Sequence, residues 1–243
     1  MFYDIYLIVA VIGVFSIVQS IFGMGILVFG TPTLLLLGFD FTTTLSYLLP
    51  ASWAISSMQI LNFKKKRPEI PLSLYFLCLP SVGIGLLLSG SMFFESYLNS
   101  FIGGTLILSS VIRYWTPAKD IFSTTIKKNM PFYHIAMGAA HGLTNLGGAL
   151  LAILANEMHS SKDNIQYTVA FYYFAFNSSQ ILVLALFMGH IEIMIENAFT
   201  AIISSVIYMS MGNRIFRTLS SNFFTNSFTL FMMMYGIVIF FRE

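Results

Sequence analysis

The chain has 243 residues, of which 57% are hydrophobic and only 9% are charged, and its mean hydropathy is +0.81. A soluble domain of this size carries more charge than this, so the composition excludes that class and indicates an integral membrane protein. The formal net charge is only +2 and no tract is basic enough for nucleic acid, so no nucleic-acid partner is expected. Long apolar stretches, rather than the alternating pattern of a barrel, predict an all-α protein that spans a lipid bilayer.

The first predicted element is the apolar run from Ile5 to Leu37. No basic segment precedes it, so we expect it to belong to the mature protein and not to a removed signal. As a single helix its 33 residues would be about 50 Å long, whereas the hydrocarbon core is about 30 Å thick. Each glycine in the sequence FGMG weakens a helix by about 1 kcal/mol, so we expect a break at Gly23–Gly25. The break would leave two pieces of roughly 15 residues, too short to span comfortably.

Six further stretches have polar flanks and enough apolar residues to be full-length spans. The basic cluster KKKR (Lys64–Arg67) follows the first of them and is expected to lie in the cytoplasm. A second glycine-interrupted region, Phe132–Met158, is expected to break at Thr144–Gly148. The six predicted spans are Thr44–Phe63, Leu72–Gly90, Tyr97–Trp115, Asn164–Met188, Ile193–Gly212 and Asn222–Phe241.

The two halves of the chain are predicted to be related. The sequence AISSMQI (Ala54–Ile60) resembles AFNSSQI (Ala175–Ile181), and the two glycine breaks repeat at nearly the same offset. We therefore predict one transmembrane repeat at residues 1–118, a central cytoplasmic loop at 119–131 and a second repeat at 132–243. Each repeat would contain a glycine-broken hairpin, or a broken span, plus three transmembrane helices.

The distribution of Lys and Arg bears on the topology. If each broken region enters and leaves on one face, the repeats are inverted and 11 of the 12 basic residues are cytoplasmic. If each broken region crosses once, the chain has eight spans and only nine basic residues are cytoplasmic. The positive-inside rule favours the inverted repeats, while both arrangements stay open.

The candidate site residues are neutral, because all ten Asp and Glu fall near the ends of the predicted spans or hairpins. This placement argues against an intramembrane enzyme, and no metal or cofactor motif is found.

The neutral candidates have alternative roles. Ser, Asn and Gln also form hydrogen bonds between packed membrane helices, and His141 is either a proton carrier or a neutral packing residue. The predicted substrate-binding residues are Gly23, Gly25, Ser56, Gln59, His141, Thr144, Asn145, Gly147, Gly148, Asn177 and Gln180.

The charge of the expected ligand follows from the breaks. A short helix would begin at each break, near Ile26 and near Gly148, with unpaired N–H groups at its start. Each helix start behaves as about half a positive charge, so two of them facing each other would hold a monoanion without a basic side chain. Broken helices at matching positions of two halves are typical of transporter sites. We therefore predict a small anionic substrate.

Two motifs resemble a known family. The sequence GMGILVFGTPTLLLLG is similar to the G-F-G-x-x-L-x-x-x-P-L-L pattern of the sulfite exporter TauE/SafE family, through Gly23, Gly25, Pro32 and Leu34. The sequence HGLTNLGGALLAIL is similar to the glycine-rich motif that opens the second half of that family. The resemblance covers nearly the whole chain.

The resemblance implies a multi-pass permease of a bacterial-type inner membrane that carries sulfite, a sulfonate or a related organic anion. Met24 replaces the more usual aromatic residue, and Ala149 stands where a proline often follows the paired glycines. An anion channel and a non-transporting membrane scaffold are the alternatives, and the sequence leaves a homo-oligomer open.

Overall fold

The computed structural model describes a helical protein, with no strand in the part of the chain that it covers, as the all-α prediction requires. Two compact units are formed: unit 1 comprises residues 1–68 and 166–218, and unit 2 comprises residues 69–165 and 219–243. Each unit therefore combines segments that lie before and after the predicted central loop in the sequence. The described residues are 2–89, 100–108, 110–111, 115, 121, 123–124, 126, 128–212, 215, 229–230, 233–238 and 240–241.

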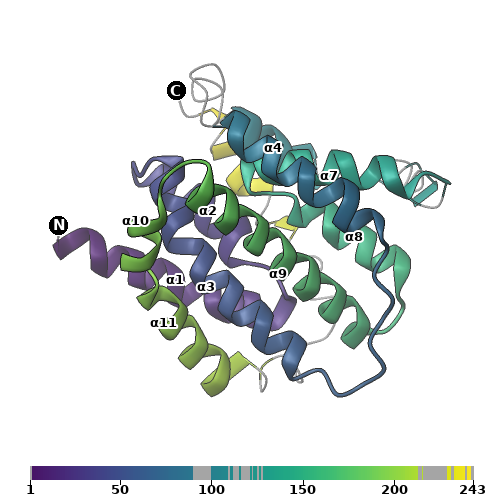
Figure 1. The fold of residues 1–243 in the computed structure, drawn as a ribbon, viewed down its shortest axis with the longest axis horizontal. Helices are drawn as coiled ribbons and strands as arrows, with labels where there is room; N and C mark the ends of the chain where they lie inside the picture. The colour runs from purple at the N-terminus through teal and green to yellow at the C-terminus, as the bar shows by residue number, and fades with distance from the viewer. Residues whose placement is uncertain are drawn as a thin grey trace. The chain divides into compact units, whose positions relative to one another are not determined.

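Unit 1 is built around α3, which packs against α1, α2 and α11. The helix α9 runs antiparallel to α3, since the Phe63 and Tyr167 rings are 4.5 Å apart and Trp53 Nε1 donates to Ser178 Oγ at 3.0 Å (Figure 1). The elements of this unit are α1 (Phe2–Phe22), α2 (Ile26–Leu36), α3 (Phe41–Leu61), α9 (Lys162–Leu186), α10 (Ile191–Glu196), α11 (Phe199–Ile207) and the π-helical turn η2 (Tyr208–Gly212).

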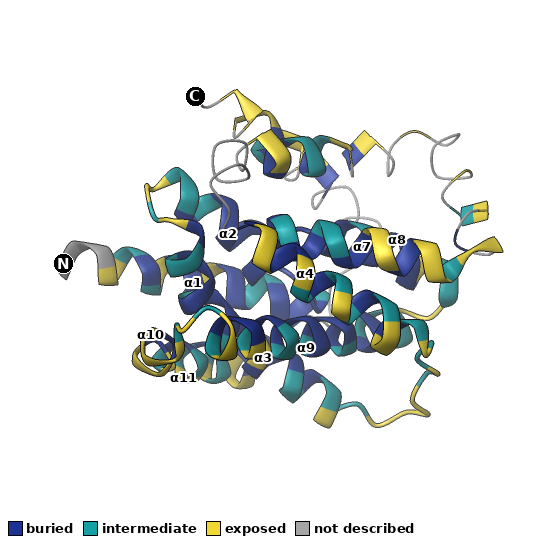
Figure 2. Ribbon diagram, turned by 45° about the horizontal axis from the view of Figure 1, so that its top comes forward, coloured by how far each residue is buried: buried dark blue, intermediate teal, exposed yellow. Residues whose placement is uncertain are grey.

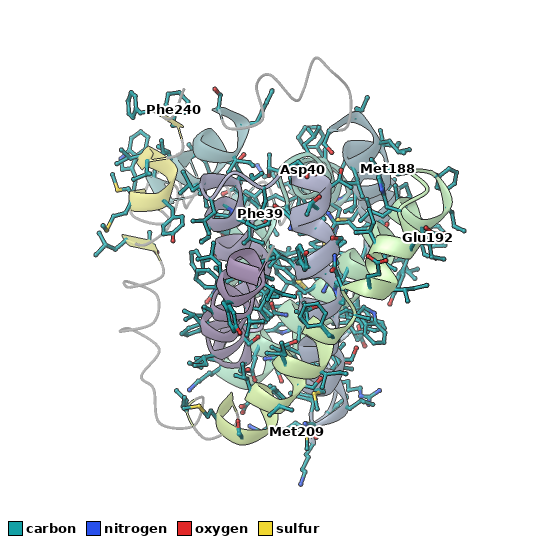
Figure 3. The ribbon with its side chains drawn as sticks, turned by 90° about the vertical axis from the view of Figure 1, so that its left-hand side faces the viewer. Phe39, Asp40, Met188, Glu192, Met209 and Phe240 are labelled. Atoms are coloured by element: carbon teal, nitrogen blue, oxygen red, sulfur yellow. The ribbon has the colours of Figure 1, made fainter. Side chains whose placement is uncertain are left out.

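The two ends of unit 1 are visible in Figure 3. Asp40, Met188 and Glu192 lie towards one end, and Met209 lies at the other. Asp40 caps the N-terminus of α3 by accepting a hydrogen bond from Thr43 N at 2.9 Å. The start of α3 and the turn between α9 and α10 therefore share one end of the unit.

The outer helix α11 is polar on its inner face and apolar on its outer face. Thr200 and Ser204 are fully buried, whereas Ile202 and Val206 are 68% and 61% exposed, as is Met209 of the following turn η2 at 73%. This arrangement is the reverse of a soluble amphipathic helix and suits a helix whose outer face contacts lipid. In contrast, α2 is buried along most of its length (Figure 2).

Two helices of unit 2 cross closely because glycines lie at their contact. Gly138 and Gly142, four residues apart on α7, lie directly against the backbone of the segment Cys78–Leu86. A Cβ at Gly142 would overlap Val82 O and lie 2.9 Å from Gly85 Cα. This small-xxx-small packing joins two helices of the same unit. The described elements are η1 (Leu74–Cys78), α4 (Leu79–Ser89), α7 (Met130–Thr144) and α8 (Gly148–Met158).

Most of the predicted spans that fall on described residues are helical. The helix α3 covers the predicted span Thr44–Phe63 up to Leu61, and η1 with α4 forms Leu74–Ser89 within the predicted span Leu72–Gly90. By length and composition, three described helical stretches can cross a membrane: Ile5–Phe22, Lys162–Leu186 and Ile191–Gly212. The last two confirm the predicted spans Asn164–Met188 and Ile193–Gly212. Parts of Tyr97–Trp115, Asn222–Phe241 and the central loop lie outside the described residues.

Both predicted helix breaks are present, and the chain folds back at each. The first region stops at Phe22 and restarts at Ile26, and the Phe15 and Phe29 rings then lie 5.8 Å apart. The second stops at Thr144 and restarts at Gly148.

One length prediction was wrong. The first piece, α1, has 21 residues and is long enough to cross a bilayer, and Ile5–Phe22 alone already has 18 residues, because the break lies well past the middle of the Ile5–Leu37 run. Its partner α2 has only 11 residues and is too short. The inverted relation of the two repeats stays a prediction.

Candidate functional site

The first break is produced by the left-handed backbone at Gly23. Its φ is 76°, and its N–H closes the last turn of α1 on Gln19 O at 2.8 Å. A glycine in this conformation is a common helix terminator, because other residues pay a steric penalty there. A Cβ at Gly23 would also lie 3.1 Å from Gln166 O and 3.1 Å from Val169 Cγ1, so α9 packs closely on the break.

Two glutamine side chains bind carbonyl groups at the C-terminal end of α1. Gln59 Nε2, from α3, donates to Gln19 O at 3.0 Å and to Ser20 O at 3.1 Å. Gln166 Nε2, from α9, donates to Ser20 O at 3.2 Å and to Ile21 O at 2.9 Å. Exposed backbone at membrane depth needs internal partners of this kind.

Replacing Gln166 by glutamate is expected to destabilise the break. The carboxylate cannot donate, so it would face Ser20 O and Ile21 O and leave Ile21 O without its donor, at a cost of about 1–3 kcal/mol, while Ser20 O would keep only its bond from Gln59. Thermal unfolding in detergent should show a lower midpoint for Gln166→Glu. The control Asn164→Asp makes the same chemical change in the first turn of α9 and should leave the midpoint unchanged. Equal midpoints for all three proteins would contradict a structural role for Gln166.

A third glutamine, Gln19, binds the start of α2. Gln19 Oε1 accepts a hydrogen bond from Ile26 N at 3.2 Å, while Phe29 N already bonds to Gly25 O at 2.9 Å. The N–H groups in the first turn of a helix have no intrahelical acceptor, so Leu27 N and Val28 N, like Ile26 N, require an acceptor from outside α2. One of the N–H groups expected at the ligand is therefore occupied by a side chain of the protein itself.

The amide group of Gln19 is held by two serines of α3. Gln19 Nε2 lies 2.9 Å from both Ser52 O and Ser52 Oγ, and 3.1 Å from Ser56 Oγ. Ser52 Oγ also accepts from Asn177 Nδ2, on α9, at 3.0 Å. A continuous polar chain thus runs from α9 through α3 to the beginning of α2.

Two acceptor atoms near this chain are buried without a hydrogen-bond partner among the described residues: Asn177 Oδ1 and Gln59 Oε1. Asn177 is fully buried, and Gln59 is 7% exposed. Leaving such a group unpaired costs about 1–3 kcal/mol, so these amides have unused capacity to bind a ligand or water.

The buried polar side chains around the first break carry no charge. Among the described residues of the whole chain, those that are buried and polar are Ser, Thr, Asn, Gln or His, and none is Asp, Glu, Lys or Arg. A ligand at the break would therefore meet hydroxyl, amide and peptide groups only. The buried polar residues of this region are Ser16, Gln19, Ser20, Thr31, Ser52, Ser56, Gln59, Asn177 and Gln180.

The second break has a similar local plan in unit 2. Asn145 has a φ of 63°, and its N–H bonds to His141 O at 2.7 Å, so it ends α7 as Gly23 ends α1. Thr144 Oγ1 accepts from Leu146 N at 3.2 Å. A Cβ at Gly147 would lie 2.5 Å from His141 Cβ and 3.0 Å from Met137 O, so the chain returns along α7 only because this residue is glycine.

The two interior histidines lie in different surroundings. His134 Nδ1 lies 3.0 Å from Ser73 Oγ and 3.1 Å from Met130 O, and this link ties α7 to the residue before η1. His141 is fully buried and lies against Gly147 at the break. Of these two histidines, His141 is the one that lies against another candidate site residue, Gly147.

The predicted site residues divide between the units. Gly23, Gly25, Ser56, Gln59, Asn177 and Gln180 belong to unit 1, whereas His141, Thr144, Asn145, Gly147 and Gly148 belong to unit 2. Within unit 1 the structure brings the polar groups together, since Gln59 bonds the end of α1 and Asn177 bonds Ser52.

Sequence reasoning missed Ser52 and Gln166. Helical spacing carried a signal for both: Ser52 precedes Ser56 by four residues, and Gln166 precedes Asn177 by 11 residues, about three turns.

Comparison with known proteins decides the family. The family model described as sulfite exporter TauE/SafE matches residues 7–239, nearly the whole chain. The chain belongs to the TauE/SafE family. A search of curated proteins and a search of solved structures gave no match. TauE/SafE proteins are membrane transporters of sulfur-containing anions. This member is therefore a multi-pass membrane protein that is surrounded by lipid and has a small-molecule substrate.

Proposed function

We propose that this TauE/SafE protein carries a small anion such as sulfite, a sulfonate or a related organic anion across a bacterial-type inner membrane. It works by alternating access, and the two broken hairpins supply the ligand contacts. In unit 1 these contacts come from the start of α2, Ser56, Gln59, Asn177 and Gln180. In unit 2 they come from the turn His141–Gly148.

The observation that carries the proposal is the neutral polar chain at the first break. Backbone interrupted at membrane depth is tolerated where it is buried in protein or lines a cavity, and transporter sites are typically built there. The helix start at Ile26 favours an anion, and hydroxyl and amide groups of Ser52, Ser56 and Asn177 lie on the same chain of contacts. The lack of a buried cation among the described residues suits a ligand that must also leave.

The test is flux in proteoliposomes that contain the purified protein and a single anion, either sulfite or methanesulfonate. A transporter should show saturable uptake that is absent from protein-free vesicles, and an excess of unlabelled anion inside should accelerate exchange. Unitary conductance without saturation would instead identify an anion channel. Absence of flux for every anion of a broad sulfur-oxyanion panel would contradict the proposal and favour a scaffold.

A further inference from the structure

We infer that the Gln19 side chain is an internal competitor of the transported anion: its amide oxygen takes the anion's position at the start of α2, and the anion displaces it. This inference rests on the proposed function, and it concerns unit 1 alone. It makes Gln19 a residue that sets affinity.

The first argument is the direction of the Gln19 amide. Its oxygen faces Ile26 N at 3.2 Å, and its nitrogen faces the serine oxygens of α3. The negative end of the amide dipole is thus turned to the positive end of α2, as a bound oxyanion would be. The bond to Ile26 N is longer than the usual 2.9–3.0 Å of an N–H···O bond, which indicates a weak interaction.

The second argument is that an oxyanion is the stronger acceptor. Hydrogen bonds to a charged oxygen are shorter than neutral ones and about twice as strong, so an anion is able to replace a carbonyl oxygen that is held at 3.2 Å. Displacement also removes Gln19 Nε2 from Ser52 Oγ and Ser56 Oγ. The Ser56 hydroxyl is then available to donate to the ligand.

The third argument is the unused hydrogen-bonding capacity of Asn177. Its Nδ2 bonds to Ser52 Oγ, the same hydroxyl that Gln19 contacts, while its Oδ1 is fully buried without a partner among the described residues. If this amide turns over, Oδ1 accepts from the Ser52 hydroxyl and Nδ2 is free to donate to an anion. A buried amide with a spare polar atom beside the Gln19 contact is independent support for a ligand here.

The test compares two variants with opposite predictions. Gln19→Met keeps the length of the side chain but removes the competing oxygen, so the KM for methanesulfonate should fall about threefold or more. Gln19→Glu places a fixed negative charge at the start of α2, so the KM should rise about tenfold or more. Methanesulfonate is the probe because its charge does not change near neutral pH. Asn164→Asp is the charge control and should keep the wild-type KM.

Opposite shifts distinguish competition from a structural role, since loss of structure would impair both variants in the same direction. If Gln19→Met does not reconstitute, Gln19→Asn replaces it, because the shorter amide cannot reach Ile26 N from the same position; its KM should also fall. KM values that move in the same direction, or not at all, in a protein whose wild type transports the probe would overturn the role of Gln19 alone. A wild-type protein that transports neither methanesulfonate nor sulfite counts against the proposed function instead.

Discussion

Replacement of Gly25 by alanine is expected to reduce anion flux about tenfold or more, since 1.4 kcal/mol corresponds to a factor of 10. A Cβ at this position would lie 2.8 Å from Gln19 N and 2.8 Å from Val18 Cγ1. Gln19 N belongs to the backbone of α1 and cannot rotate away. The start of α2, with the Ile26 N–H that is proposed to bind the anion, would have to move away from α1, at a cost of about 1–3 kcal/mol.

The flux measurement needs a glycine control on the same hairpin. Gly13 lies within α1, and among the residues that the structure describes a Cβ there would meet only Ile207 Cδ1 at 3.8 Å, an ordinary contact. Gly13→Ala should therefore transport at the wild-type rate, and both variants should reconstitute in similar amounts. Normal flux through Gly25→Ala would show that the tight return of the chain at this break is not needed for transport.

Replacement of Gly142 by leucine is expected to disrupt unit 2 and lower the thermal midpoint in detergent by about 10 °C. Even a Cβ at Gly142 would overlap Val82 O and lie 2.9 Å from Leu86 N, and both of these are backbone atoms of α4. A leucine would force α7 and α4 apart, which removes the close packing on which helix association in lipid depends. The expected cost is about 3 kcal/mol, at the upper end for an overpacked interior.

Ala136 provides the matched control on α7. It lies on the exposed face of the same helix, so Ala136→Leu adds the same side chain where nothing needs to move, and its midpoint should stay at the wild-type value. Equal midpoints for Gly142→Leu and the wild type would mean that α7 and α4 do not cross at these glycines. The result also bears on the scaffold alternative, because Gly138 and Gly142 are engaged inside the chain and not at an outer surface.

Local sequence was sufficient to predict the interruptions and most helices. Gly23–Gly25 and Thr144–Gly148 are the positions at which the helices stop, because left-handed backbone and close chain contacts require the residues found there. The excess apolar length of Ile5–Leu37 also predicted an interruption, since a helix longer than the bilayer must divide or bend. The length of α1 was mispredicted because the break divides the Ile5–Leu37 run unequally, so that Ile5–Phe22 alone has 18 residues.

The sequence by itself therefore determined the membrane class, the family and the places where helices break, all of which depend on composition and neighbouring residues. Only the tertiary structure decided which side chains serve the first break. Gln59, Gln166 and Asn177 reach it from α3 and α9, which are distant along the chain. Tertiary packing alone brings the Gln59 and Gln166 amides to carbonyl groups at the end of α1 and the Asn177 amide to Ser52, because interrupted backbone in a membrane must find partners wherever the fold supplies them.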